Sequence, residues 1–180
     1  MLELKYPSSV WKHCPYCGST DLKWINGTHR MCCEKCGGIF YINAAAAVVA
    51  IIQNDRGEFL FTRRKNDPFA GTLDFPGGFV DLDERAENAI IREVKEELNL
   101  DISDIRFFMS MPNRYLFGGI VYFTLDLVFF CDYDKLSNMK ADDDISEYLF
   151  IPVDKVNIED IGLESIKIIV EKLKTLQKTE

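Results

Sequence analysis

Three carboxylates stand close together in the stretch FPGGFVDLDERAENAIIREVKEELNL, which spans residues 75–100. On a helix that turns about 100° per residue, Glu93, Glu96 and Glu97 fall within one arc of about 100°. Like charges at these spacings repel one another, so a purely structural helix gains nothing from them. Oxygen-rich clusters of carboxylates suit hard divalent cations such as Mg²⁺ and Mn²⁺. The spacing therefore predicts a metal site on this helix.

The helix that must position these carboxylates is predicted from about residue 85 to residue 98. Its apolar positions at helical spacing are Ala86, Ile90, Val94 and Leu98, and they form one buried stripe. The arc of glutamates borders this stripe and partly overlaps it. Carboxylates beside a core are costly unless a cation joins them. We therefore expect the glutamates near the core, held together by metal ions.

The same stretch resembles the signature of the Nudix hydrolases, in which a glycine and a glutamate precede Arg-Glu and Glu-Glu pairs at fixed spacing. The matching positions here are, in order, Gly78, Glu84, Arg92, Glu93, Val94, Glu96, Glu97 and Leu100. Asn99 stands where the family has glycine, and asparagine is the next-best residue for the left-handed conformation that ends a helix. The resemblance covers about residues 43–175. It implies an α/β/α sandwich around a mixed sheet, and hydrolysis of a nucleoside diphosphate linked to another moiety.

The resemblance also implies roles for individual residues. Glu93 and Glu97 would bind Mg²⁺ or Mn²⁺, with Glu96 as a further ligand or acting through water. The carbonyl of Gly77 would complete the metal shell. Arg92 would orient the carboxylates by charge-assisted hydrogen bonds. Among the remaining positions of the signature, Glu84 would position the loop and the helix.

A carboxylate from a later loop is a further expected ligand. Glu147, which precedes YLFIPV, fits this place best, and Asp142 to Asp144 are its rivals. Bound cations would neutralise the diphosphate, activate a water and stabilise the leaving phosphate. A carboxylate of the cluster or Glu147 would take the proton of that water, and the sequence does not decide between them.

A second constellation lies near the N-terminus, where five of the six cysteines fall within residues 14–36. Two Cys-x-x-Cys-Gly turns, with fifteen residues between Cys17 and Cys33, use Cys14, Cys17, Cys33 and Cys36. Paired turns of this kind are typical of zinc sites, because each turn aims two thiolates at one point. They predict a zinc ribbon over residues 1–41, with Zn²⁺ as a structural cofactor. A redox dithiol and a pair of disulfides are the less favoured interpretations.

The remaining cysteines and histidines are assigned around this site. Cys32 adjoins Cys33, and the symmetry of the two turns favours Cys33 as the ligand. His13 and His29 are expected on the surface, because four thiolates already complete a tetrahedral site. Cys131, in the apolar run VFFCDY, is predicted to be a buried structural thiol. A ribbon this small cannot bury enough core to fold alone, so the metal would supply its folding energy.

Residues 42–180 are the predicted Nudix hydrolase domain. The run AAAAVVAIIQNDRGEFLFTRR indicates a β-hairpin that turns near residues 55–57. Further strands are expected at IRFFMSM, GIVYFTLDLVFF and YLFIPV. An amphipathic helix is expected within residues 159–178. Its apolar positions are Ile166, Ile169, Val170, Leu173 and Leu176.

A zinc ribbon followed by a Nudix domain resembles the NADH pyrophosphatase branch, whose members split NADH or related dinucleotides into mononucleotides. That branch carries a Ser-Gln-Pro-Trp-Pro-Phe-Pro segment after the signature, whereas SMPNRYLFGG here lacks the tryptophan and most of the prolines. This departure leaves NADH and ADP-ribose as equal alternatives. Tyr115, Phe117 and Tyr122 are candidates for stacking on a base, although aromatic residues in strands more often belong to the core.

Composition restricts the partners. The net charge of −8 disfavours a membrane surface or nucleic acid in general. The chain has no apolar run long enough for a signal peptide or a membrane span, which favours a cytoplasmic protein that acts on a small nucleotide. A nucleotide-sensing regulator stays an alternative, although such regulators commonly lose the signature carboxylates that this chain keeps. Hydrolysis of a capped RNA end, with the mildly basic ribbon touching RNA, and a homodimer also stay open.

Overall fold

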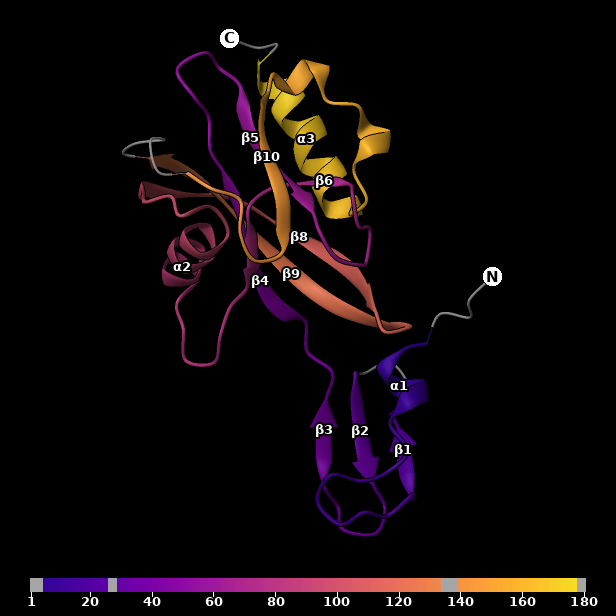
Figure 1. The fold of residues 1–180 in the computed structure, drawn as a ribbon. Helices are drawn as coiled ribbons and strands as arrows, with labels where there is room; N and C mark the ends of the chain where they lie inside the picture. The colour runs from indigo at the N-terminus through magenta and orange to yellow at the C-terminus, as the bar shows by residue number, and fades with distance from the viewer. Residues whose placement is uncertain (1–4, 26–28, 134–138, 178–180) are drawn as a thin grey trace. The chain divides into compact units, whose positions relative to one another are not determined.

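The computed structural model describes residues 5–25, 29–133 and 139–177. The chain forms two compact units. The first unit consists of residues 1–44 and 114–123, and the second of residues 45–113 and 124–180. Figure 1 labels the elements of both units.

The first unit contains a three-stranded antiparallel sheet in the order β1-β2-β3. Its elements are α1 (Pro7–Val10), β1 (Leu22–Trp24), β2 (Arg30–Cys33) and β3 (Ile39–Tyr41). Aromatic contacts join the sheet to the preceding segment, with ring centroids 6.2 Å apart for Trp11 and Trp24 and 4.7 Å apart for Tyr16 and Phe40. Such contacts supply apolar burial that a sheet of this size lacks by itself.

The turn of a long hairpin, residues 114–123, completes the first unit. Lys5 forms a parallel bridge with Ile120, and the ring of Tyr6 stacks on Phe123 at 6.2 Å. The N-terminal segment is therefore tied to this hairpin turn by backbone pairing and by an aromatic contact.

The second unit contains a four-stranded mixed sheet in the order β7-β4-β9-β8 and a three-stranded sheet in the order β10-β5-β6. The strands are β4 (Ala45–Ile51), β5 (Phe59–Arg64), β6 (Leu73–Asp74), β7 (Gly77–Phe79), β8 (Ile102–Phe117), β9 (Ile120–Tyr133) and β10 (Ile145–Ile151). The helices are α2 (Ala86–Leu98), η1 (Val153–Lys155), η2 (Ile158–Asp160) and α3 (Glu164–Gln177). Strand β4 runs parallel to β9 and antiparallel to β7.

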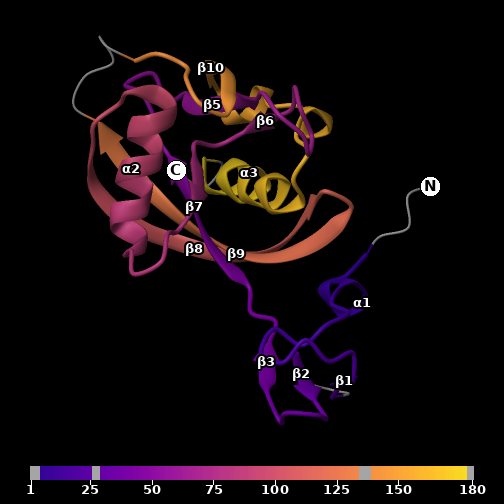
Figure 2. The same ribbon diagram turned by 60° about the horizontal axis from the view of Figure 1, so that its bottom comes forward.

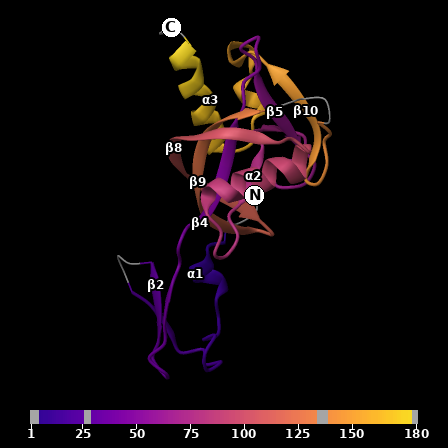
Figure 3. The ribbon, with the colours of Figure 1, turned by 90° about the vertical axis from the view of Figure 1, so that its left-hand side faces the viewer.

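Helices α2 and α3 lie on opposite sides of the four-stranded sheet, as Figures 1 and 2 show. Figure 3 gives the view in which α2 lies in front of the sheet. This arrangement confirms the predicted fold class, an α/β sandwich around a mixed sheet. No helix in the described part of the chain is long and apolar enough to cross a membrane.

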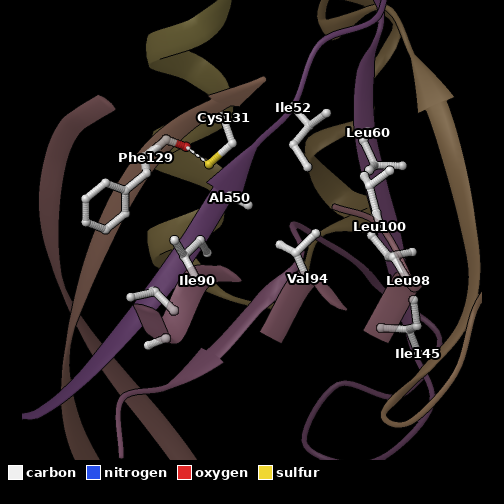
Figure 4. Close-up of a cluster of buried hydrophobic side chains, with 12 residues drawn as sticks. Ala50, Ile52, Leu60, Ile90, Val94, Leu98, Leu100, Phe129, Cys131 and Ile145 are labelled. Carbon is white, nitrogen blue, oxygen red and sulfur yellow. Dashed lines mark hydrogen bonds between the residues drawn. The ribbon is translucent and has the colours of Figure 1, made fainter. Parts of the chain in front are cut away.

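A hydrophobic core joins α2 to one face of the sheet. Ile90 and Val94 of the helix pack with Ala50 of β4 and with Phe129 and Cys131 of β9, as Figure 4 shows. The alternate residues of β4 are also buried, so this strand is covered on both faces. Burial on both faces is expected for a strand with a parallel neighbour.

Helix α2 matches its prediction closely. It begins after Arg85 and ends at Leu98, and Asn99 follows with φ 51° and ψ 32°, the left-handed conformation expected there. Strands β8, β9 and β10 confirm the three later predicted strands. In α3 the predicted stripe is buried except for Leu176, which is 40% exposed in the last turn. Residue 178 of the predicted helix lies outside the described residues.

The predicted β-hairpin is confirmed only near its turn. The N–H of Asn54 donates to the carbonyl of Glu58 and that of Leu60 to the carbonyl of Ile52, both at 2.9 Å. Beyond these bonds β4 and β5 enter different sheets. The reason is that a strand has two edges, and β7 and β9 occupy both edges of β4.

Candidate active site and metal centres

Arg92 gathers the acidic side chains of α2 and of the preceding loop. Its Nε and Nη2 donate to Glu84 at 3.0 and 2.8 Å, and its Nη1 donates to Glu93 at 2.8 Å and to Glu96 at 3.1 Å. Hydrogen bonds from Arg92, helped by the N–H of Asp81, hold the pKa of Glu84 below its usual range. The guanidinium fork therefore holds three carboxylates in fixed positions.

Glu97 is the buried carboxylate of the group, with 7% of its surface exposed. One of its oxygens accepts a hydrogen bond from the N–H of Gly77 at 3.1 Å. Burial raises the pKa of Glu97 well above its ordinary value, against the lowering effect of that N–H, and the charge of Asp74 adds to the rise. Gly77 has φ 151°, and a Cβ there would overlap the carbonyl of Val48. Only glycine therefore fits beside Glu97.

Glu93 is also largely buried, with 14% of its side chain exposed. Burial raises its pKa, although the hydrogen bond from Arg92 opposes the rise. A Cβ on Gly78 would lie 2.6 Å from Oε1 of Glu93, so the glycine makes room for this carboxylate. The side chain of Glu96 is 48% exposed. The expectation of glutamates beside the core thus holds for Glu93 and Glu97, while Glu96 faces outward.

The donor set at Glu93 and Glu97 fits a hard divalent cation. Both groups are carboxylates whose burial raises the pKa, and the charge of Glu93 also raises the pKa of Glu97. A nearby positive charge would relieve both effects, and oxygen ligands of this type suit Mg²⁺ or Mn²⁺. The carboxylate oxygens of Glu93 and Glu97 do not form, with another described carboxylate, a group of three or more ligand atoms as close together as the cysteine sulfurs. Within the described ranges, the cysteines supply the one group of three or more ligand atoms lying within 4.8 Å of one another.

Glu147 and Asp143, two candidates for a further metal ligand, lie in different surroundings. Glu147 lies on β10, is half exposed, and pairs with Nε of Arg63. Asp143, one of its predicted rivals, is among the charges that raise the pKa of both buried glutamates, after the effect of burial. The loop before Asp143 is tied to α2, because the N–H of Asp142 donates to the carbonyl of Glu97 at 2.8 Å. This hydrogen bond places the loop that carries Asp143 next to the last turn of α2.

Comparison with known proteins decides the family. The NUDIX domain family matches residues 43–171. The chain belongs to the Nudix family. An ADP-ribose pyrophosphatase from Methanocaldococcus jannaschii is 33% identical over 136 residues, which cover 74% of this chain and 76% of that protein. With the signature carboxylates intact, this Nudix chain is a pyrophosphohydrolase, as its sequence predicts.

One further relative and one solved structure show how far the similarity extends. The NAD-capped RNA hydrolase NudC from Vibrio atlanticus is 28% identical over 115 residues, which cover 64% of this chain but only 42% of that protein. This chain therefore matches less than half of that NudC protein. A solved Nudix hydrolase from Nitrosomonas europaea has a TM-score of 0.69 at 23% identity, covering 88% of this chain and 87% of that one. The latter likeness supports the Nudix fold alone.

Two charged residues of this Nudix domain were missed by sequence reasoning. Nη1 of Arg64 donates to Asp74 at 2.8 Å, and the N–H of Phe75 donates to the other oxygen of Asp74 at 2.9 Å. Burial raises the pKa of Asp74 despite the charge of Arg64. The signal was present in the basic run TRRK and in the aspartate just before Phe-Pro-Gly-Gly, but only the pairing of β5 with β6 brings them together.

The aromatic candidates for substrate binding lie near the end of strand β8. Tyr115 and Phe117 lie on β8, their rings stack at 6.4 Å, and Phe117 is 56% exposed. Both belong to the first unit, whereas the carboxylates belong to the second. The segment SMPNRYLFGG continues strand β8 up to Phe117. The segment therefore forms a continuous strand up to Phe117, where the NADH pyrophosphatase branch has a proline-rich segment.

The four predicted zinc ligands come together in the first unit. The sulfurs of Cys14 and Cys36 lie 3.7 Å apart, those of Cys17 and Cys33 lie 3.6 Å apart, and all four lie within 4.8 Å of one another. Cys32 is outside the group because adjacent residues of β2 point to opposite faces. Four thiols at this spacing are compatible with zinc. His13 and His29 are exposed and Cys131 is buried, as predicted.

Proposed function

We propose that this enzyme hydrolyses the diphosphate linkage of ADP-ribose or of a related dinucleotide such as NADH, using Mg²⁺ or Mn²⁺. The burial of Glu97 beside Gly77 and of Glu93 beside Gly78, which raises the pKa of both carboxylates, is the observation that carries the proposal. The 33% identity with an ADP-ribose pyrophosphatase supports ADP-ribose as the first substrate to test.

The proposal assigns each side chain a task. Glu93 and Glu97 would hold the cations, with the carbonyl of Gly77 and the more exposed Glu96 as further ligands. Divalent cations, when bound, neutralise the diphosphate and lower the pKa of a bound water. One carboxylate of the cluster, or a later carboxylate, would accept the proton of the attacking water. Arg92 and Glu84 would keep these groups in place.

Two further parts of the chain have proposed roles, a carboxylate after β9 as a metal ligand and the N-terminal segment as a zinc site. Asp143 is the favoured later ligand because its charge acts on both buried glutamates, and Glu147 remains its rival. Residues 1–41 would form a zinc ribbon with structural Zn²⁺ at the four cysteines, followed by a hydrolase domain over residues 42–180. The close approach of the four sulfurs supports the zinc assignment.

A second candidate substrate is an RNA that ends in NAD. The match to an NAD-capped RNA hydrolase favours it. The five Lys or Arg and three Asp or Glu of residues 1–41, in a chain whose net charge is −8, could provide a mildly basic surface for RNA. The diphosphate linkage in such a cap is the same chemical group as in NAD itself, so the same carboxylates would act on both substrates.

The test is a substrate panel with Mg²⁺ or Mn²⁺ and chromatographic separation of the products. It compares ADP-ribose, NADH, NAD⁺, nucleotide sugars, nucleoside triphosphates and an NAD-capped oligonucleotide. We expect the ADP-linked diphosphates to be cut faster than the triphosphates. The Glu97→Gln protein, prepared in the same way, controls for contaminating hydrolases. A strong preference for a triphosphate would contradict the proposal.

A further inference from the structure

We propose that Asp126 is a specificity-determining residue that accepts hydrogen bonds from the vicinal hydroxyls of a ribose in the substrate. The inference rests on the proposed function, since it names the group of the diphosphate substrate that lies next to the phosphates. It adds a residue outside the Nudix signature to the site.

Asp126 is a buried carboxylate on the central part of the sheet. It lies on β9, is 4% exposed, and is the register partner of Ala47 on β4. Its neighbours Leu127 and Phe129 pack in the core beneath α2, where Figure 4 shows Phe129. Because successive side chains of a strand point to opposite faces, Asp126 lies on the face turned away from α2.

The fold leaves this carboxylate incompletely satisfied. Oγ1 of Thr124 donates to Oδ1 of Asp126 at 2.8 Å, and no other donor to Asp126 is present among residues 5–25, 29–133 and 139–177. No ion pair of Asp126 is present among these residues either. A buried carboxylate without a cation costs free energy, whereas asparagine would fill the same space at lower cost. The fold alone therefore does not explain an aspartate here.

Small side chains lie beside this carboxylate on the same face. Ala45 and Ala47 of β4 are the register partners of Thr124 and Asp126. Ala45 is exposed and Ala47 is partly exposed, whereas Val49 and Ile51 further along β4 are buried. The two alanines are therefore accessible to solvent, next to the buried side chains of Thr124 and Asp126. A flat, hydroxyl-bearing group could lie over the alanines and reach Asp126.

The position of Asp126 relative to the catalytic carboxylates identifies the ligand. On β4, Ala47 pairs with Asp126 of β9 on one edge and with Phe79 of β7 on the other. Phe79 lies two residues after Gly77, whose N–H donates to Glu97. In an ADP-linked diphosphate, a ribose is the first group beyond each phosphate. A carboxylate only accepts hydrogen bonds, and a vicinal diol supplies two O–H donors.

A metal ion is a poorer match than a ribose for this residue. In the described part of the chain, the oxygens of Asp126, Asp74 and Glu97 do not form a group within 4.8 Å of one another. Mg²⁺ demands several oxygen ligands in near-octahedral geometry. Thr124 already donates its hydroxyl proton to Asp126, which is an arrangement that orients the carboxylate toward further hydroxyl donors.

The experiment measures kcat/KM for ADP-ribose and for its analogues that lack the 2′-hydroxyl of one ribose or the other. We expect the wild type to prefer ADP-ribose over one analogue by about 10²-fold or more, because a site built to bind a hydroxyl rejects a substrate without it. Asp126→Ala should lose this preference, mostly through KM, and should cut the deoxy analogue as the wild type does. Asp126→Asn, which keeps the shape, should give an intermediate preference. Asp132→Asn, at an exposed position of the same strand, should leave every rate unchanged.

Three outcomes overturn the inference. They are equal wild-type kcat/KM for ADP-ribose and both analogues, an equal loss on all substrates in Asp126→Ala, and a weaker affinity of Asp126→Asn for Mn²⁺ measured without nucleotide. The second outcome would indicate a structural role and the third a metal ligand. A wild type that cuts neither ADP-ribose nor NADH contradicts the proposed function instead, so the two failures are distinguishable.

Discussion

The cysteine cluster of the first unit and the glutamate cluster of the second are both sets of metal-type ligands, but they are built in opposite ways. Four sulfurs lie within 4.8 Å of one another, and backbone bonds of 2.8 Å from Gly18 to Cys14 and from Gly37 to Cys33 close the two turns that carry them. The glutamates are instead held by other protein groups. Arg92 binds Glu93, and the N–H of Gly77 binds Glu97.

This difference matches the metals proposed for the two clusters, a structural Zn²⁺ at the cysteines and an exchangeable divalent cation at the glutamates. Two local turns suffice to gather thiolates at one point, so the site can be closed on all sides by protein. Carboxylates that must release product cannot be closed in that way. Because Arg92 and Gly77 hold them in place without an ion, we expect the fold of the second unit to survive removal of the divalent metal.

The largest effect is expected from opening the cysteine cluster. Cys33→Ser should abolish zinc binding and unfold the first unit, because structural zinc contributes about 10–16 kcal/mol in small zinc domains. Elemental analysis of protein purified without chelator measures the metal, and limited proteolysis reports the unfolding. Cys32→Ser is the matched control and should retain one zinc per chain. Zinc lost from Cys32→Ser and kept by Cys33→Ser would mean that the neighbouring thiol is the ligand.

Removing one charge from the glutamate cluster should affect catalysis more than folding. We expect Glu97→Gln to lower kcat by about 10²–10⁴, because it removes a carboxylate that would bind metal or accept a proton. Steady-state kinetics on the best diphosphate substrate measures this change. Glu87→Gln, on the exposed side of the same helix, should leave kcat unchanged. Equal activity of Glu97→Gln and wild type would show that Glu97 serves the fold instead.

Arg92→Lys tests whether the guanidinium group of Arg92 holds the glutamates in position. Lysine keeps the charge but loses the fork that contacts Glu84, Glu93 and Glu96 at once. Loss of such a supporting contact typically costs about 10–100-fold in activity or metal affinity. Titration with Mn²⁺ beside the kinetics separates the two effects. A variant with unchanged affinity and rate would exclude an orienting role for Arg92.

Divalent metal should stabilise the second unit without being required for its fold. A ligand that binds only the folded state adds about 2.7 kcal/mol at a hundred times its Kd. We expect Mg²⁺ to raise the Tm of the wild type and to raise that of Glu97→Gln less. Differential scanning calorimetry with and without chelator measures both shifts. Cooperative unfolding of the wild type on chelation alone would contradict the comparison between the two clusters.

The smallest effect is a pH dependence of the metal-free protein. Burial raises the pKa of Glu97 in the folded state, so folding favours its protonated form. Its contribution to stability is fully present below the unfolded pKa and is lost as pH rises through the folded pKa. We expect the Tm of Glu97→Gln minus that of the wild type to grow with pH above the ordinary glutamate range. A difference that stays constant or shrinks with rising pH would contradict the buried, protonatable Glu97.

Short-range features of this protein were determined by its sequence. The span of α2, the left-handed Asn99 at its end and the two cysteine turns each depend on residues a few positions apart. Helix periodicity and turn chemistry are local properties, so the pattern of residue types is enough to predict them. The Nudix signature is likewise confined to one loop and one helix.

Only the tertiary structure decided which distant groups share the site. It separated β4 from β5, joined Arg64 to Asp74, and brought the charge of Asp143 close to the buried glutamates. It also turned Asp126 away from the α2 core, next to Ala47. These outcomes depend on which strand edges pair and on how deeply each carboxylate is buried. Neither property can be read from spacing along the chain, because residues far apart in sequence compete for the same edges and for the same few cations.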